Sequence, residues 1–143
     1  MPPSAPDIAR QFIQAWNADR RSLVDEWAAP TLTVDYPHFP EPLEGPEAFK
    51  EMLARTHRFF PDLTIEVHAV VGEGPPVAVR WTYRGTFREG EMFGVAADGQ
   101  FVATTGMTMY RIEDGRVQEA RGVVDNVGLM AQLGAEPRPA NER

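Results

Sequence analysis

The sequence predicts an α+β fold in which a strongly curved, cone-shaped sheet, antiparallel or mixed, wraps around three N-terminal helices. The first observation is the order of the patterns, because three helical segments precede most of the strands. The second is strand length, because strands of about ten residues twist and coil strongly. Short turns between the strands favour antiparallel pairing, with the helices on one face. Such a cone, closed at one end by helices, leaves an apolar pocket at the other end.

Two helices open the chain. Asp7 can cap the first helix, which extends to about Ala18 because its apolar residues recur at helical spacing. Three prolines precede Asp7, so we expect a mobile lead-in and an ordered core over about residues 7–134. Ser22 offers the N-cap of a second, short helix that ends before Pro30.

A strand and a third helix follow. Residues 31–36 alternate in polarity and are rich in β-branched residues, which predicts a strand. The prolines after Tyr36 cannot donate to a strand ladder, so the strand ends there. Pro46 begins the third helix, over residues 47–60, and Pro61 stops it.

The rest of the chain is mainly β-structure. The predicted strands cover residues 63–71, 77–87, 101–111 and 116–124. Residues 88–100 form the one long connection, and long loops at a cavity mouth often carry function. A short apolar C-terminal helix closed by Gly134 follows the last strand, and residues 135–143 form a polar tail.

Composition restricts the class of protein. At 143 residues with 43% hydrophobic residues, the chain fits one domain, residues 1–143. The net charge of -7 argues against nucleic acid and anionic membranes as partners, and no apolar run is long enough to span a membrane. Cysteine is absent, and no spacing of His, Asp and Glu resembles a metal site. We therefore expect a cytoplasmic protein without a metal.

Asp125 is the first candidate catalytic residue. It follows an apolar strand end, where desolvation would raise its pKa toward the range useful for proton transfer. With Asp114-Gly115 as a two-residue turn, the pairing count places Asp125 opposite Thr104 and Arg121 opposite Thr108.

On that count the side chains of Asp125 and Arg121 share one face and point into the cone together. Arg121 then either pairs with a carboxylate as a structural contact or binds a ligand oxygen. Asp125 alternatively only caps the terminal helix, a role that its position also permits.

Other side chains are candidates to meet a ligand in the pocket. His38, at the end of the first strand, and His57, on the third helix, are candidates for a second proton-transfer group. Aromatic side chains are mostly core residues, but some must line a cavity. The expected lining residues are Trp16, Tyr36, Trp81 and Tyr83.

The order of several short motifs resembles the SnoaL-like polyketide cyclase family. These motifs are WNA at 16–18, EGPEAFKEML at 44–53, FFPDL at 59–63, VAVRWTYRGTF at 77–87, MYRIEDGRV at 109–117 and DNVGLMAQLG at 125–134. The resemblance implies the cone-shaped fold of the nuclear transport factor 2-like superfamily, a homodimer and no cofactor. It also implies that Asp125, at the position of the family's aspartate before the last helix, is the acid/base of an intramolecular aldol closure.

Two functions remain open from the sequence. The first is an acid/base enzyme of the cyclase, isomerase or hydratase kind, acting on an apolar oxygenated ligand such as a polyketide or steroid-like compound. The second is a non-catalytic small-molecule-binding or accessory protein of the same fold. The second is favoured by Arg121 and Phe87, which stand where many family members have tryptophan and histidine.

Overall fold

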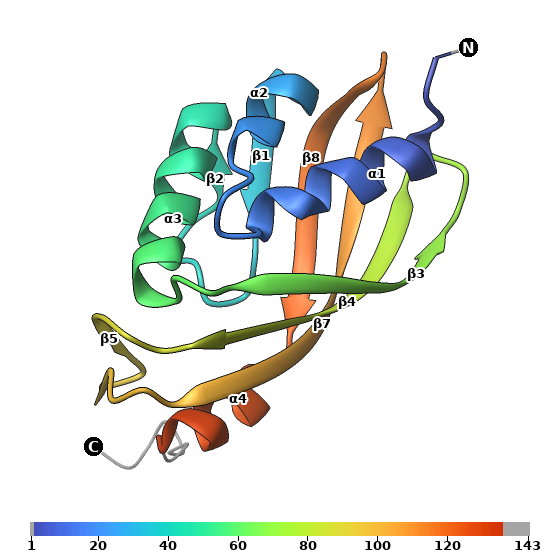
Figure 1. The fold of residues 1–143 in the computed structure, drawn as a ribbon. Helices are drawn as coiled ribbons and strands as arrows, with labels where there is room; N and C mark the ends of the chain where they lie inside the picture. Colours follow the sequence, from blue (N-terminus) through green and yellow to red (C-terminus); the bar gives the residue numbers. More distant parts are fainter. Residues whose placement is uncertain (1, 136–143) are drawn as a thin grey trace.

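The computed structural model describes residues 2–135 and has the predicted α+β architecture. A long, curved sheet forms one layer, and α1, α2 and α3 lie against its concave side (Figure 1). The short helix α4 lies at the far end of the sheet, beside β7. The six-stranded sheet has the order β2-β1-β8-β7-β4-β3, and a separate two-stranded hairpin is formed by β5 and β6.

The helices begin and end close to the predicted positions. They are α1 (Ala5–Ile13), the 3-10 turn η1 (Gln14–Trp16), α2 (Ser22–Trp27), α3 (Pro46–Phe59) and α4 (Asn126–Leu133). The predicted caps of the first two helices were wrong. Ser4 caps α1 and Asp7 bonds back to the Ser4 backbone from the third helical position, which is a capping box. Ser22 is the first residue of α2, and Arg21 precedes it without a side-chain cap.

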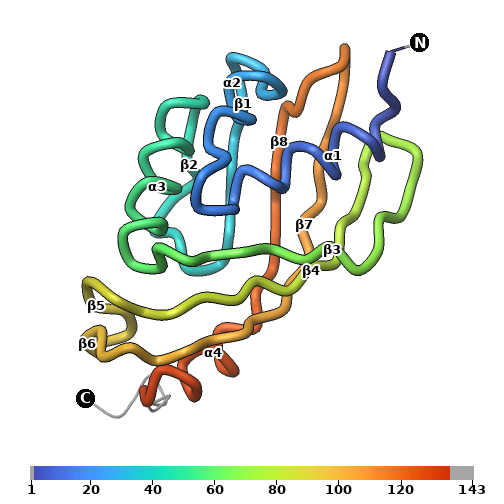
Figure 2. Tube along the Cα trace, viewed as in Figure 1, coloured from blue at the N-terminus to red at the C-terminus, as the bar shows by residue number. Residues whose placement is uncertain are grey.

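The sheet is mixed. Its strands are β1 (Ala28–Asp35), β2 (Leu43–Glu44), β3 (Thr64–Val71), β4 (Val77–Thr86), β7 (Phe101–Glu113) and β8 (Arg116–Val124). Strands β3, β4, β7 and β8 form an antiparallel meander, and β1 joins it by pairing with β8 in parallel. In Figure 2 these two strands, about 90 residues apart in the chain, lie side by side. Residues 88–100 carry β5 (Glu91–Met92) and β6 (Val95–Ala96).

The pairing of β7 with β8 departs from the predicted register. Glu113 pairs with Arg116 as predicted, but a bulge follows in which Arg111 pairs with Glu119 and Ile112 with Val117, so Gln118 is an extra residue in β8. Beyond the bulge, Thr108 therefore pairs with Gly122 rather than with Arg121. A shift of one residue moves every later side chain of the strand to the opposite face.

The concave face of the sheet and the helices form the main core. On β7, the side chains of Val102, Thr104, Thr108, Tyr110 and Ile112 alternate inward and are buried. They meet the apolar stripes of α1 and α3, where Phe12 contacts both Phe49 and Tyr110. A smaller core lies at the far end of the sheet, where Phe60, Phe87 and Val102 pack with Leu129 and Leu133 of α4.

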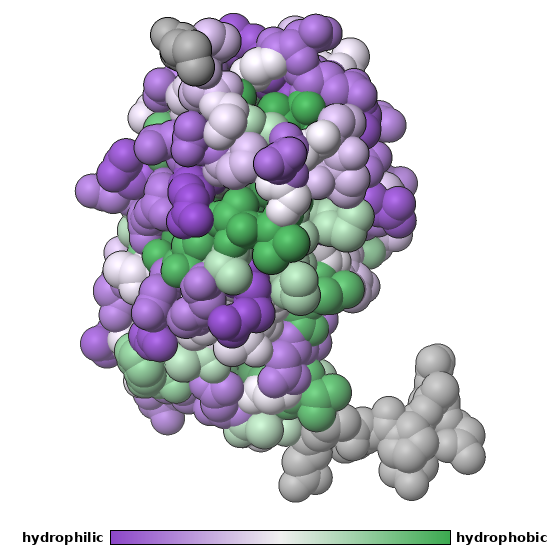
Figure 3. Space-filling view, turned by 90° about the vertical axis from the view of Figure 1, so that its right-hand side faces the viewer, coloured by the Kyte–Doolittle hydropathy of each residue, from purple (hydrophilic) through white to green (hydrophobic). Residues whose placement is uncertain are grey.

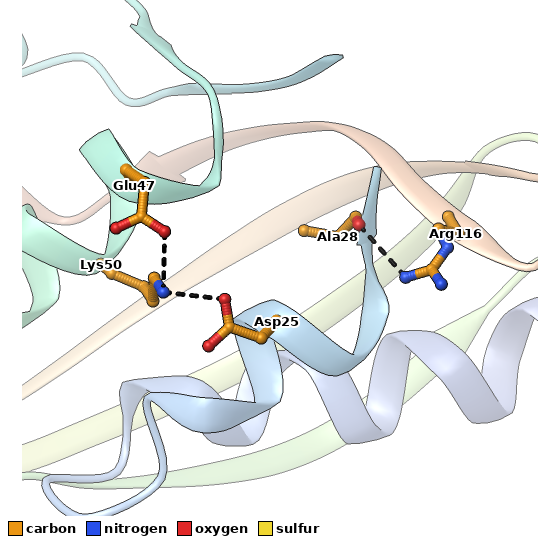
Figure 4. Close-up of polar contacts among 5 residues, drawn as sticks. All are labelled: Asp25, Ala28, Glu47, Lys50 and Arg116. Carbon is orange, nitrogen blue, oxygen red and sulfur yellow. Dashed lines mark hydrogen bonds and ion pairs between the residues drawn. The ribbon is translucent and has the colours of Figure 1, made fainter. Parts of the chain in front are cut away.

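Polar contacts position α2 against its neighbours (Figure 4). The Nζ of Lys50 on α3 lies 2.7 Å from Oδ1 of Asp25 on α2 and 2.9 Å from Oε1 of Glu47. After α2, the guanidinium of Arg116 on β8 donates to the carbonyl oxygen of Ala28 over 3.4 Å. Ion pairs at the surface stabilise little, so these contacts chiefly orient α2.

The outer face of the sheet exposes apolar side chains. Met107 and Met109 of β7 are 43% and 50% exposed, and Val123 of β8 is 60% exposed. Figure 3 shows hydrophobic side chains gathered in the middle of the side that faces right in Figure 1, bordered by hydrophilic ones. Among the described residues, no helix has the length and hydropathy needed to cross a membrane.

Candidate active site

A cavity of about 230 Å³ lies between α3 and the concave face of the sheet. Most of its lining is aromatic or aliphatic, and the cavity opens to solvent on one side. The apolar lining residues include Trp16, Tyr36, Phe39, Met52, Phe59, Phe60, Leu63, Ile65, Trp81, Tyr83, Met92, Phe93, Val124 and Leu129. Its volume is somewhat below the roughly 300 Å³ at which ordinary ligand pockets begin, so it fits a small ligand.

Segments that are far apart in the sequence build the wall of this cavity. Met52, Thr56 and Phe59 follow each other at helical spacing, so one face of α3 forms one side. Tyr36 and residues 38–40, between β1 and β2, form a second side. Trp81 and Tyr83 alternate inward from β4, and their rings stack with centroids 5.6 Å apart. Met92 of β5 and Phe93 in the turn after it add to the wall from the predicted long connection, and η1, β3, β8 and α4 contribute Trp16, Ile65, Val124 and Leu129.

A hydrogen-bond chain lies at the floor of the cavity. The indole N–H of Trp81 donates to Oγ1 of Thr108 over 2.9 Å, and the same oxygen lies 2.8 Å from the Tyr36 hydroxyl. Gly122 makes room for this arrangement, because a Cβ at that position would collide with the Tyr36 ring. Burial raises the pKa of Tyr36 to about 12, so its phenol stays protonated at neutral pH.

A second phenol faces the cavity from β4. Burial raises the pKa of Tyr83 to about 12, against the opposing effect of the Thr104 hydroxyl beside it. Thr104 pairs with Tyr83 across the sheet and is 2% exposed, yet its Oγ1 makes no hydrogen bond of good geometry with any described residue. Thr104 and Thr108 thus lie behind the cavity wall, each next to a tyrosine that lines it.

His38 lies at the mouth of the cavity. Its ring packs edge-on against Phe39 with centroids 4.8 Å apart, and it also contacts Tyr36. Desolvation lowers the pKa of His38 below its usual range, so the imidazole is neutral at neutral pH and can accept a proton.

His57 is held in a structural network and does not line the cavity. Its Nδ1 lies 2.8 Å from the guanidinium of Arg21, which can only donate, so Nδ1 is the acceptor. The other ring nitrogen, Nε2, then carries the proton and donates to the Trp16 carbonyl over 2.9 Å. Burial lowers the pKa of His57, and the positive charge of Arg21 acts in the same direction.

The expected face for Asp125 and Arg121 was wrong. Because of the bulge in β8, Arg121 pairs with Met109 and is exposed on the outer face, while Gly122 and Val124 face inward. The Asp125 amide donates to the carbonyl of Thr105, not of Thr104. The Asp125 side chain is exposed, and its Oδ1 accepts a hydrogen bond of 2.9 Å from the Gly128 N–H, which caps α4. Asp125 does not line the cavity.

Three polar residues of the cavity were absent from the sequence-based candidates. Arg55 and Thr56 come from α3, and Asn126 is the first residue of α4. Helical spacing offered a signal for the first two, because both lie next to the apolar stripe of α3. Nothing in the sequence marks Asn126, which lines the cavity from the first position of α4.

No metal site is evident in residues 2–135. These residues contain no cluster of three or more His, Asp or Glu side chains arranged to hold an ion. The ionisable side chains of the lining are instead His38, Arg55, Tyr36 and Tyr83. The cavity can therefore supply neutral hydrogen-bond donors, one titratable imidazole and one permanent positive charge.

The chain is similar to known proteins over nearly its whole length. The family model of the SnoaL-like polyketide cyclases matches residues 6–133. The aklanonic acid methyl ester cyclase DnrD of Streptomyces peucetius is 28% identical over 143 residues, covering 95% of this chain and 94% of that protein.

Solved structures agree with this match. IdmH of Streptomyces antibioticus, named as a candidate polyketide cyclase, is 31% identical with a TM-score of 0.76, covering 91% of this chain and 99% of that one. A SnoaL-like protein of Jannaschia sp. CCS1 is 29% identical with a TM-score of 0.77, covering 91% and 90% of the two chains. The fold, the family model and these relatives support a small-molecule cyclase or isomerase role. The chain belongs to the SnoaL-like polyketide cyclase family.

Proposed function

We propose that the protein is a cofactor-independent cyclase or isomerase that acts on an apolar, oxygenated small molecule such as a polyketide or steroid-like compound. The observation that carries this proposal is the composition of the cavity: an aromatic lining with two protonated phenols inside and a neutral imidazole at its mouth. Aldol closure and double-bond isomerisation both begin when a base removes a proton next to a carbonyl group. The negative charge that develops on the carbonyl oxygen then needs a hydrogen-bond donor.

The phenols of Tyr36 and Tyr83 are suited to this second task. The Thr108 oxygen accepts the indole N–H of Trp81, and either hydroxyl of the Thr108–Tyr36 pair can be the donor. We propose that Thr108 donates its proton to the Tyr36 oxygen. The Tyr36 oxygen then accepts, which leaves the phenol proton free for a ligand oxygen. A chain of donors oriented in one direction stabilises an oxyanion without rearrangement during the reaction.

Two residues compete for the role of base. The family resemblance assigns the role to Asp125, which our expectation also named as general acid/base. Both side chains are exposed, but cavity geometry favours His38, because His38 lines the cavity and is neutral, whereas Asp125 does not line it and its carboxylate caps α4. We propose His38 as the base. Asp125 then has a positioning role, because it caps α4 and so holds Asn126 in place.

Proton exchange on a simple ketone tests this assignment without knowledge of the natural substrate. The probe is 2-tetralone, whose α-protons exchange with deuterium oxide through an enolate, and the exchange is followed by NMR. We expect the wild-type protein to accelerate exchange, and His38→Gln to lose about 100-fold or more of the acceleration. Tyr36→Phe should lose a comparable factor, whereas Asp125→Asn, which keeps the cap, should retain nearly all of it.

Two other results would redirect the proposal. Loss of exchange in Asp125→Asn with full activity in His38→Gln would make Asp125 the base. Binding of the ketone without any acceleration would favour the second candidate function, a small-molecule-binding protein. That function is favoured by one observation, since no carboxylate lines the cavity within residues 2–135.

We also propose that the protein is a homodimer. The family resemblance implies a dimer, and the outer face of β7 and β8 offers an apolar surface for one, with Met107, Met109 and Val123 exposed. Burying that surface against a second copy would remove these side chains from water.

A further inference from the structure

The charges at the cavity are unlike those of the rest of the chain. The protein carries 21 Asp and Glu residues against 14 Lys and Arg. Among the residues that line the cavity, however, there is no carboxylate, and Arg55 is the one permanently charged side chain. A positively charged lining in an acidic protein points to a ligand of negative charge.

Arg55 is positioned to meet such a ligand. It lies on the face of α3 that carries Met52, Thr56 and Phe59 into the cavity. Arg55 is about one helical turn from Met52 and about one turn from Phe59. Its guanidinium forms no ion pair with any residue in the described part of the chain, whereas Lys50 on the same helix is held by Asp25 and Glu47. The donors of Arg55 are therefore available to a ligand.

Other polar groups of the cavity lining can also donate hydrogen bonds. Asn126 has an amide NH₂ group, and the imidazole of His38 has one N–H. The hydroxyl groups of Tyr36, Thr56 and Tyr83 are further polar groups of the lining, and the rest of it is mainly apolar and encloses about 230 Å³. This arrangement suits a ligand with a compact apolar body inside the cavity and an anionic, oxygen-rich end at its mouth.

We propose that the cavity selects small aromatic or alicyclic ligands that carry a free carboxylate, and that Arg55 is the residue that binds this carboxylate. The guanidinium presents two parallel N–H groups, which match the two oxygens of a carboxylate. The corresponding methyl ester carries no negative charge, so Arg55 would remain without a charged partner in its complex. This inference rests on the proposed ligand cavity, but it does not depend on catalysis.

Matched ligands and matched variants test the inference. The ligands are 2-naphthylacetic acid and its methyl ester, and their binding is measured by isothermal titration calorimetry at pH 7.5. We expect the wild-type protein to prefer the acid by about tenfold or more, because hydrogen bonds to charged groups are the stronger ones. Arg55→Gln should abolish the preference by weakening the acid alone, and Arg55→Lys should restore part of it.

Arg58 provides the control. It lies three residues further along α3, is exposed and does not line the cavity. Arg58→Gln removes the same charge from the same helix, so it should leave the preference for the acid unchanged. Thermal unfolding of each variant by circular dichroism checks that the fold is retained, as expected for exposed positions.

Each contrary result has a distinct meaning. Equal affinity of the wild-type protein for acid and ester, or equal effects of Arg55→Gln and Arg58→Gln, overturns the assignment of Arg55 while leaving the proposed function intact. Failure of both ligands to bind overturns the cavity as a ligand site and the present inference with it. Loss of ketone exchange with an intact acid preference would overturn only the proposed function.

Discussion

The hydroxyl groups of Tyr36 and Thr108 lie 2.8 Å apart and connect the end of β1 to the middle of β7 beneath the cavity. Thr108 is completely buried and also accepts the indole N–H of Trp81. One small side chain is therefore the hydrogen-bond partner of two aromatic side chains. Both aromatic residues line the cavity. The position of the cavity wall thus depends on a residue that a ligand does not reach.

Replacing Thr108 with valine should destabilise the protein. Valine has nearly the same shape, but it leaves the Trp81 N–H and the Tyr36 hydroxyl buried without a partner. We expect the free energy of unfolding, from urea denaturation, to fall by about 1–3 kcal/mol. Thr108→Ser keeps the hydroxyl and should lose less, so equal losses in the two variants would contradict this account.

His57 should make stability dependent on pH in the weakly acidic range. Its pKa is lowered in the folded protein, chiefly by burial, so near its unfolded pKa of about 6.5 the unfolded chain binds the proton more readily. The contribution of His57 is therefore complete above about pH 6.5 and is lost as the pH falls through the lowered pKa.

Urea denaturation between pH 7.5 and pH 5.5 measures this effect. The wild-type protein should lose stability toward pH 5.5, and His57→Gln should show a smaller slope. His68→Gln is the control, because the His68 side chain is exposed and hydrogen-bonds only to Thr82. A slope that is unchanged in His57→Gln would mean that other groups cause the pH dependence.

Asp125 should act as a helix cap whether or not it takes part in catalysis. Removing the carboxylate in Asp125→Ala leaves the Gly128 N–H unpaired and should lower the free energy of unfolding by about 0.5–2 kcal/mol. Asp125→Asn should be nearly neutral, because asparagine caps as well as aspartate. Gly128→Ala should resemble Asp125→Ala, since a Cβ at position 128 would collide with the Asp125 carboxylate. The three variants are compared by thermal and urea unfolding.

The outer face of the sheet should mediate dimer formation. Light scattering after size-exclusion chromatography should give the wild-type protein about twice the chain mass of 16.0 kDa at micromolar concentration. Met109→Glu places a charge at the centre of the apolar face and should shift the protein to monomer. Val71→Glu changes an exposed residue at the end of the edge strand β3 and should not. A monomeric wild-type protein would disprove the proposed dimer.

Periodicity predicted the fold because most elements have a clear apolar face. The strand patterns of β3, β4 and β8 were predicted to within one residue at each end, since Gly, Pro and Asp-Gly turns mark their ends. The parallel pairing of β1 with β8 was not foreseen, because contacts between distant segments leave no local pattern. The predicted caps were displaced by three residues for α1 and by one residue for α2, because Asp7 and Ser22 are cap-forming residue types that lie just inside the helices.

Some residues of the site were predicted correctly from the sequence, and others were not. Trp16, Tyr36, His38, Trp81 and Tyr83 were all selected from the sequence, and the structure brings these five together around the cavity. Aromatic residues on inward strand positions are predictable because alternation alone fixes their face. Arg121 was misplaced because a bulge has no reliable sequence signature, and a single unpaired residue reverses the face of everything that follows.

The bulge at Gln118 decides which alternate residues of β8 face the inside of the protein and which face solvent. In the present register, Val124 of β8 lines the cavity and Gly122 faces the Tyr36 ring, while Arg121 and Val123 face solvent. Deleting one residue at the bulge would exchange the two sets and bring a cation and a carboxylate, Arg121 and Asp125, to the inner wall. A single-codon deletion is thus a direct evolutionary step between an uncharged and an ion-paired cavity wall, and protein engineers can take the same step deliberately.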